Sequence, residues 1–452
     1  MAGDPYDRFT EFLTSTKRDQ SHEHAGRSPV SKDRDRVIHC GAFRRLQRKS
    51  QIVGVQANDF FRTRLTHTVE CAQIGRGIAN RSLGSNLEGV VGEDAHLPDL
   101  IEAACLAHDL GHPPFGHNGE RALQAMMYKH ARRSFEGNAE SFRIVTNLEP
   151  KYQEADRWCG LDLTRTTLQA ILKYPWDEND ERAKEKKKFC IYDEPEDQDV
   201  FAWLFDGEEP KRTIATDILE AADDIAYAVH DFEDGVWSQM IPLFRFYDEA
   251  NTQARDQLID RAKALDPDVF EGADFDALLA DLLPDPAAYP WAVVPFDRSR
   301  VARAGLKNFS AGVIGDFIDA VTPGDAFAEP TGDVQRKILL LKGMARVWMI
   351  ESASQETLRF GQRRLVEDLF EGYWANTGML QREAWARVTQ PTQSDRDLSE
   401  DQAGKLKPED LPVWRAKARV ICDHVSGMTD LYALHMHAEM YAGGSAPNLR
   451  LI

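Results

Sequence analysis

A small set of histidines and aspartates has the residue types expected of a metal site. His67 lies in RTRLTHTVE, His108 and Asp109 are adjacent in LAHDLGH, and Asp223 lies in EAADDIAY. Adjacent side chains cannot share one face inside a helix, but at a helix end both can bend toward one ion. Two imidazoles and two carboxylates suit a borderline or hard divalent cation, such as Mn, Fe, Co, Mg or Zn, better than a thiolate-loving one.

Each piece taken alone has a plainer interpretation. A lone histidine on a helix is more often a core or surface residue than a ligand, and a His-Asp dipeptide is common. The aspartate pair at 223–224 is harder to dismiss, because it lies well inside a periodic segment. A buried carboxylate in the middle of a helix needs a partner.

The segment after the His-Asp pair adds two more histidines. LGHPPFGHNGE places His112 and His117 on a stretch stiffened by Pro and Gly. If Asn118 caps the next helix, Glu120 can reach back and orient the His117 imidazole, three residues earlier. A histidine held in this way beside a metal can donate or accept a proton. The alternative is a simple turn with histidines on its surface.

A polar stripe continues from Asp223 along the same segment. Asp223, Tyr227 and Asp231 are spaced by four residues, so they share one helical face. Such groups could line a pocket beside the metal and form hydrogen bonds with hydroxyls, for instance those of a sugar. A structural polar seam is the alternative.

Basic residues cluster before and around His67, on a chain whose net charge is −19. Arg binds phosphate in bidentate fashion, so the cluster predicts a local anion site. Arg64, one turn before His67, is the strongest candidate. No Walker A loop and no GxGxxG motif precedes a helix, so phosphate would not be held as in P-loop proteins. The cluster comprises Arg44, Arg45, Arg48, Lys49, Arg62 and Arg64.

The elements that must position these residues are predicted to be mainly α-helical. Helical periodicity runs over 65–83, from Pro98 until GHPP ends the helix at 111–114, and over 214–236. Residues 333–372 and a last long unit from about 410 to 441 are also expected to be helical. Strand signals are short, as at 50–55 and 190–192.

The chain divides into three predicted parts. Residues 1–36 form a polar arm, 37–240 form the core that carries the candidate site, and 241–452 form a helical region packed on it. The charge-segregated insert at 177–211 is expected to be an exposed hairpin or loop. The acidic, proline-bearing stretch at 265–300 predicts a short helix between surface loops.

Composition excludes several classes of protein. With 42% hydrophobic and 29% charged residues in 452, the chain is not disordered. No apolar stretch resembles a secretory signal or a membrane span. Six scattered cysteines without a CxxC pair favour reduced thiols in the cytoplasm. The acidic surplus argues against duplex DNA as an electrostatic partner.

Six motifs, in order from about Arg34 to Leu434, resemble the deoxyguanosinetriphosphate triphosphohydrolase (dGTPase) family of HD-domain metal phosphohydrolases. This resemblance implies an HD-domain helical bundle enlarged by extra helices, and a divalent metal ion (Mn, Mg, Co, Fe or Ni). It also implies a homo-oligomer, with a hexamer favoured, and a possible nucleotide or single-stranded DNA activator. The motifs are RTRLTHTVECAQIGR, HDLGHPPFGHNGE, FEGNAESFRI, KYPW, EAADDIAYAVHDFED and GMTDLYAL.

The resemblance also implies a role for each matching residue. His117 would be the catalytic acid or base, with Glu120 behind it. The implied metal ligands are His67, His108, Asp109 and Asp223. The implied substrate contacts are Gln51 and Asp231 for the 3′-hydroxyl, Tyr227 for the deoxyribose, Arg64 for the α-phosphate, and His112, Asn138 and Lys173 on the phosphate side.

The implied reaction cleaves a deoxynucleoside triphosphate (dNTP) at the α-phosphorus, releasing deoxynucleoside and tripolyphosphate. One alternative is an HD phosphohydrolase for another nucleotide, such as a 5′-nucleotidase or an alarmone hydrolase. Another is a nucleotide-binding regulator with a vestigial HD site. Gln51, Tyr227 and Asp231 together favour a deoxyribose, and the intact ligand set argues against a regulator. The 178–212 and 265–300 segments match no motif, and the base preference stays open.

Overall fold

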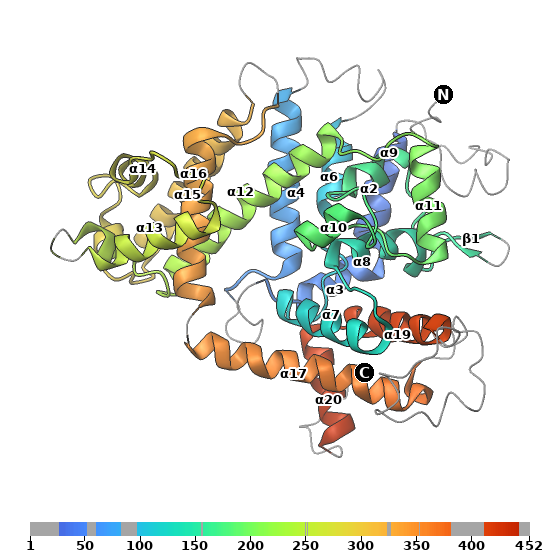
Figure 1. Cartoon of the computed structure of the whole chain (residues 1–452). Coiled ribbons are helices and arrows are strands. Elements are labelled where there is room, and N and C mark those ends of the chain that lie inside the picture. Colours follow the sequence, from blue (N-terminus) through green and yellow to red (C-terminus); the bar gives the residue numbers. More distant parts are fainter. Residues whose placement is uncertain are drawn as a thin grey trace.

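Apart from one short pair of strands, the regular secondary structure of the described residues is helical, which confirms the mainly α prediction. The computed structural model describes residues 27–51, 60–82, 97–154, 157–248, 250, 252–322, 327–351, 353–380 and 411–442. In Figure 1 two long helices, α4 and α12, lie near the centre. Helices α13 to α16 lie on one side of them, and α7, α17, α19 and α20 lie below.

Three helices form the centre of the core and carry the candidate site. They are α4 (Arg64–Ser82), α6 (Leu97–Ala107) and α12 (Ile214–Trp237). Thr213 and Thr216 form a capping box that starts α12, and the helix runs for 24 residues. Its apolar side chains, among them Ile218, Ala222 and Ile225, are fully buried, so α12 packs against both α4 and α6. The three periodic segments are helices within a few residues of their predicted limits.

Shorter elements complete the first half of the chain. Helix α2 begins inside the predicted arm of residues 1–36 and buries Val30 and Val37, while residues 1–26 lie outside the described part. These elements are α2 (Pro29–His39), α3 (Gly41–Arg45), η1 (Leu46–Arg48), α7 (His117–Ala131), α8 (Gly137–Arg143), the π-turn η2 (Ile144–Leu148), β1 (Gln153–Glu154), β2 (Arg157–Trp158) and α9 (Arg165–Ile171).

The expected hairpin or loop at 177–211 is wrong, because this insert contains two helices. They are α10 (Glu181–Lys186) and α11 (Pro195–Phe205). Asp180 caps α10 and proline occupies the first turn of α11, while Val200 and Leu204 are buried four residues apart. The many charged residues of this insert made its helix-capping and apolar signals hard to recognise in the sequence. The only paired strands in the described chain, β1 and β2, lie earlier, at 153–158.

The second half of the chain is helical but more divided than its periodicity predicts. The stretch at 265–300 contains one short helix between loops, as predicted, together with the 3-10 turn η4. The 333–372 segment breaks after a π-turn, and the last unit breaks at 427–429. The elements are η3 (Leu243–Tyr247), α13 (Gln253–Leu265), α14 (Phe275–Leu282), η4 (Pro290–Val293), α15 (Arg300–Ala320), α16 (Gly332–Met344), η6 (Ala345–Ile350), α17 (Ala353–Ala375), η7 (Thr377–Met379), α19 (Leu411–Ser426) and α20 (Asp430–Tyr441).

Two hydrophobic clusters hold these helices together. The larger one joins α2, α4, α6 and α12 to the helices of 253–344. The smaller one joins α7 to α17 and α19 through residues such as Leu123, Phe370 and Ile421. Helices α17 and α19 therefore pack against α7, the helix that follows the GHPPFGH loop (Figure 1).

Two further predictions can be compared with the structure. All six cysteines are buried and none forms a disulfide in the described part of the chain, in agreement with reduced thiols. Among the described residues, no helix combines the length and the apolar character needed to cross a membrane.

Candidate metal and nucleotide site

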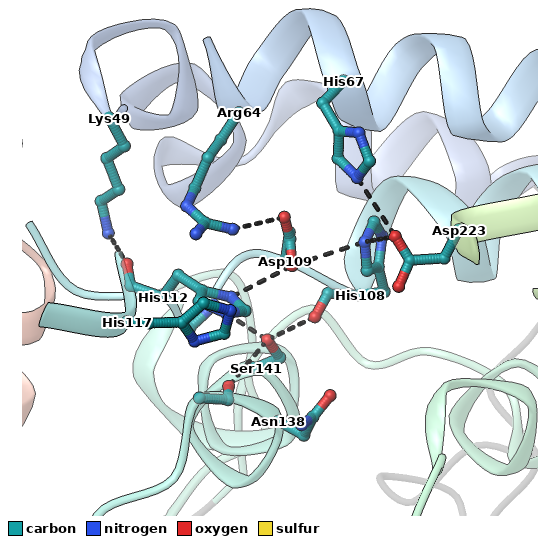
Figure 2. Close-up of polar contacts among 12 residues, drawn as sticks. Lys49, Arg64, His67, His108, Asp109, His112, His117, Asn138, Ser141 and Asp223 are labelled. Carbon is teal, nitrogen blue, oxygen red and sulfur yellow. Dashed lines mark hydrogen bonds and ion pairs between the residues drawn. The ribbon is translucent and has the colours of Figure 1, made fainter. Parts of the chain in front are cut away.

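The four predicted metal ligands converge from three elements. His67 comes from α4, His108 and Asp109 from the turn after α6, and Asp223 from α12, and Figure 2 shows them pointing toward one another. His67 Nε2 lies 3.1 Å from Asp223 Oδ1, and His108 Nε2 lies 3.4 Å from both Asp223 Oδ1 and Asp109 Oδ1. The neighbouring Asp224 instead pairs with Lys342, at 2.6 Å.

The orientation of His108 fits metal binding. Its Nδ1 lies 2.6 Å from the carbonyl oxygen of Cys105, one turn back, which fixes the ring with Nε2 toward the cluster. That Nε2 is buried and has no hydrogen-bond partner in the described chain. Donor atoms of His67, His108 and Asp109 all lie within 4.8 Å of one another, so a single divalent cation could contact all three.

The electrostatics of the cluster favour a positive charge at its centre. Burial lowers the pKa of His108, but Asp109 and Asp223 outweigh it and raise that pKa to about 10. Burial raises the pKa of Asp223, yet Lys173 and His108 hold it well below its usual range. Two carboxylates that stay ionised, the buried Asp109 and the partly exposed Asp223, are typical of a cation site.

Two predicted phosphate contacts already reach this cluster. The Arg64 guanidinium donates from Nη1 to Asp109 Oδ2 at 2.6 Å, and the Lys173 ammonium donates to Asp223 Oδ2. Both side chains are buried. Two buried cations beside a cluster of N and O donors form a surface that an anion, such as a phosphate, would neutralise.

The loop after the His-Asp pair brings two more histidines to the site. His112 Nδ1 lies 3.0 Å from Asp109 Oδ1, and the rings of His112 and His117 are 5.3 Å apart. Burial and the nearby Arg64 lower the pKa of His112 to about 4, so its imidazole is neutral at pH 7. His112 can therefore serve as a neutral hydrogen-bond partner for a phosphate oxygen.

His117 lies at the open side of the site and is oriented by Glu120. His117 Nδ1 is 2.7 Å from Glu120 Oε2, and 61% of the His117 side chain is exposed. Burial raises the pKa of Glu120, but its hydrogen bond to His117 and the charge of Lys188 hold that pKa well below the usual range. The predicted cap is wrong in one detail: Gly116, not Asn118, precedes α7.

The polar stripe of α12 borders the same cluster. Tyr227 packs edge-on against His67, with ring centroids 6.3 Å apart. Asp231 is buried, and its Oδ2 has no hydrogen-bond partner among the described residues. Burial and the charge of Asp234 raise the pKa of Asp231 well above its usual range. Its carboxyl group can therefore accept or donate a hydrogen bond to a ligand hydroxyl.

Two predicted contacts are less closely tied to the cluster. The Asn138 amide donates to Glu136 Oε1 at 2.9 Å, and Figure 2 places it beyond Ser141, on α8. Gln51 has a buried Oε1 without a partner in the described residues, next to a segment, 52–59, that the structure does not describe. Their roles stay predictions.

Several residues that shape the site were not predicted. Ser141 accepts from Gly111 N at 2.9 Å and donates to the His108 carbonyl at 2.8 Å. His230 lies edge-on to His67, with ring centroids 6.3 Å apart, and was visible as a second His-Asp pair in AVHD. A serine carries no such signal, because its partners are distant in sequence.

The comparison with family models assigns two segments. Residues 64–174 match the HD domain, and residues 329–439 match the phosphohydrolase-associated domain. The first match begins at Arg64 and includes three of the four predicted ligands, while Asp223 follows it. The helical fold and this His/Asp cluster define an HD-domain phosphohydrolase, a class that uses a divalent metal ion.

Curated relatives narrow this class to one family. A deoxyguanosinetriphosphate triphosphohydrolase-like protein of Streptomyces coelicolor is 36% identical over 437 residues, covering 92% of this chain and 93% of the relative. A protein of the same description from Bifidobacterium longum is 34% identical over 97% of this chain and 87% of its own length. One from Shewanella sp. (strain ANA-3) is 29% identical, over 96% of both. The chain belongs to the deoxyguanosinetriphosphate triphosphohydrolase-like family.

Proposed function

We propose that this protein is a metal-dependent triphosphohydrolase of deoxynucleoside triphosphates. It would cleave the substrate at the α-phosphorus and release deoxynucleoside and tripolyphosphate. The observation that carries the proposal is the convergence of a two-His, two-Asp cluster with two buried cations, Arg64 and Lys173. Such a surface suits a polyphosphate bound to a divalent cation.

The ligand set would be His67, His108, Asp109 and Asp223. The metal supplies Lewis-acid chemistry when bound, polarising a phosphoryl oxygen and making water a better nucleophile. Mn, Mg, Co, Fe and Ni all fit a nitrogen and oxygen donor set of this kind. We therefore propose a divalent metal of this group.

Protein side chains would complete the reaction. On substrate binding, Arg64 and Lys173 would exchange carboxylate partners for phosphate oxygens, and His112 and Asn138 would contact the same group. Water would add to the α-phosphorus while the bond between that phosphorus and the 5′-oxygen breaks. His117, held by Glu120, would protonate that departing oxygen or position the water.

Residues of α12 and the preceding loop would select the sugar. Tyr227 lies against His67, so its ring would pack on the deoxyribose and leave little room for a 2′-hydroxyl. Asp231 and Gln51 each have a buried oxygen without a partner in the described residues, and these oxygens would accept from the 3′-hydroxyl.

Product analysis tests this function. The purified protein is incubated with each of the four dNTPs and with GTP, in Mn²⁺ or Mg²⁺, and the products are resolved by anion exchange. Deoxynucleoside with tripolyphosphate is the expected result, and the relative rates identify the preferred base. Monophosphate with pyrophosphate, or free phosphate, would assign different chemistry to the site. If no turnover occurs, even with mixed dNTPs or single-stranded DNA added as activators, a binding regulator becomes the better hypothesis.

Further features of the proposal follow from the family and await their own tests. We propose a cytoplasmic homo-oligomer, with a hexamer favoured, and a nucleotide or single-stranded DNA as a possible activator. Light scattering on the purified protein, with and without dNTP, would give the subunit number.

A further inference from the structure

The last helices of the chain reach the loop that carries His112 and His117. Two side chains make the connection: Lys49, just after η1, and Asp430, the first residue of α20. Only 1% of Lys49 and 5% of Asp430 is exposed. Neither residue belongs to the His/Asp cluster, and an ionisable side chain buried this deeply needs polar partners.

Asp430 joins two separate segments through its two oxygens. Its Oδ1 accepts a hydrogen bond from Phe115 N at 2.8 Å. Its Oδ2 accepts from Ser50 N at 2.9 Å and also from the Ser50 hydroxyl. Hydrogen bonds to a buried carboxylate are among the stronger ones in proteins. Asp430 therefore fixes the loop before His117 relative to the residue before Gln51.

Lys49 provides a second connection to the same loop. Its Nζ donates to the carbonyl oxygen of His112 at 2.5 Å and to that of Ser426, the last residue of α19, at 2.9 Å. Figure 2 shows the Lys49 side chain extending to the backbone of His112. The C-terminal helices therefore hold the loop at two points, three residues apart.

The loop has a conformation that requires such support. Phe115 has a φ of 64°, in the left-handed region that residues with a side chain seldom adopt, and Gly116 follows with a φ of 56°. A strained backbone of this kind persists only where surrounding contacts impose it. The hydrogen bond from Phe115 N to Asp430 acts at the strained residue itself.

We propose that Asp430 and Lys49 are positioning residues, through which the C-terminal helices hold His112 and His117 against the metal cluster. This inference rests on the proposed function, since it assumes that both histidines act on the substrate. If so, the phosphohydrolase-associated segment contributes directly to the geometry of the active site.

The central experiment is the Asp430→Asn substitution in the full-length protein. The amide keeps the shape, but its NH₂ group must face either Ser50 N or Phe115 N, so one hydrogen bond is lost. Hydrogen–deuterium exchange of peptides covering 110–117 should become faster, while peptides of α4 and α6 stay as in the wild type. We expect kcat to fall about tenfold or more, because small displacements of catalytic groups are costly. Metal content, measured by inductively coupled plasma mass spectrometry, should not change.

Two further variants make the test decisive. Lys49→Met, which removes the donor to His112, should give the same pattern and replaces the first variant if that one does not fold. Glu439→Gln changes an exposed carboxylate of the same helix, whose partner is His435, and should match the wild type. Unchanged exchange at 110–117 would overturn the proposal, as would faster exchange with wild-type kcat. A wild type without dNTP hydrolysis would refute the proposed function instead, while the exchange data would still report on the loop.

Discussion

At the scale of single residues, Asp109 contacts several other residues of the candidate site at once. Its carboxylate contacts His108, His112 and Arg64, so one side chain links the metal cluster, the loop and a phosphate-binding candidate. Burial raises its pKa, but the nearby cations keep it well below its usual range, so Asp109 stays ionised. A permanent negative charge at this position is what a metal cation requires.

Replacing Asp109 with alanine should therefore remove both metal and turnover, and His108→Ala should do the same. A buried site that loses one of four ligands binds a divalent cation far more weakly. Metal analysis of the purified variants, together with the product assay, checks this. Asp224→Ala is the matched control. Asp224 pairs with Lys342 rather than with the His/Asp cluster, so this variant should keep its metal. An Asp109→Ala protein with full metal content and full activity would contradict the ligand assignment.

His117→Ala should separate binding from catalysis. The variant should retain metal, since His117 lies outside the four-ligand cluster, but lose roughly a hundredfold or more in kcat if the imidazole transfers a proton. His39→Ala, at an exposed position on α2, provides the control. Normal turnover by the His117 variant would mean that His117 is only a surface residue of the turn and has no role in the reaction.

At the scale of elements, the site depends on how closely α8 approaches the turn after α6. A Cβ built on Gly111 would lie 2.1 Å from Ser141 N and 2.4 Å from Gly137 O. Both atoms belong to the backbone of α8, so no side chain can move aside. Glycine at 111 therefore lets α8 place Ser141 against the His108 carbonyl, which holds the His-Asp turn in position.

Gly111→Ala should both destabilise the protein and disturb the His/Asp cluster. Overpacking against backbone costs about 1–3 kcal/mol, and here the displaced element also supports His108. Denaturant unfolding measures the first effect, and metal affinity measures the second. Gly312→Ala in α15, where an added Cβ would meet nothing within 4 Å, should instead be neutral or stabilising. Equal stability of the two variants would refute this account of Gly111.

The sequence predicted elements better than it predicted their contacts. Helix α12 has an uninterrupted three-four apolar periodicity and a capping threonine, and its limits differ from the prediction by one residue. The insert was missed because charged residues dominate α10 and the first half of α11. The roles of Ser141, Lys49 and Asp430 could not be read from the sequence, because each depends on a partner brought close only by folding.

At the scale of the whole molecule, the proposed metal site brings together residues from separate helices. His67 is on α4, His108 and Asp109 lie in the turn after α6, and Asp223 is in the middle of α12. A bound ion would therefore crosslink the centre of the core. Ligands that bind only the folded state stabilise it by mass action.

Metal addition should accordingly raise the melting temperature. At a metal concentration about 100 times Kd, the gain is about 2.7 kcal/mol. Differential scanning fluorimetry of chelator-treated protein, titrated with Mn²⁺, measures it. The shift should vanish in Asp109→Ala, and an equal shift in that variant would place the stabilising ion elsewhere.

Stability should also respond to pH through Glu140, which is buried in α8. Burial and the charge of Asp423 raise its pKa from 4.5 to about 7. Folding thus favours its protonated form: this contribution is fully present below about pH 4.5 and is lost as the pH rises through 7. Glu140→Gln stays neutral at every pH. Its free energy of unfolding, relative to that of the wild type, should therefore be about 1–3 kcal/mol higher at pH 8.5 than at pH 5.5. Denaturant unfolding at both pH values tests this, and a constant difference would contradict it.

The bonds of Lys49 and Asp430 also constrain the order in which the site can form during synthesis. Lys49 and Ser426 are separated by 377 residues, and Ser50 and Asp430 by 380. Proteins leave the ribosome N-terminus first. All four proposed metal ligands lie at or before Asp223, so they emerge long before α19 and α20 exist. A nascent chain can therefore gather these side chains early, but the loop of His112 and His117 gains its final supports only after α19 and the start of α20 have been synthesised.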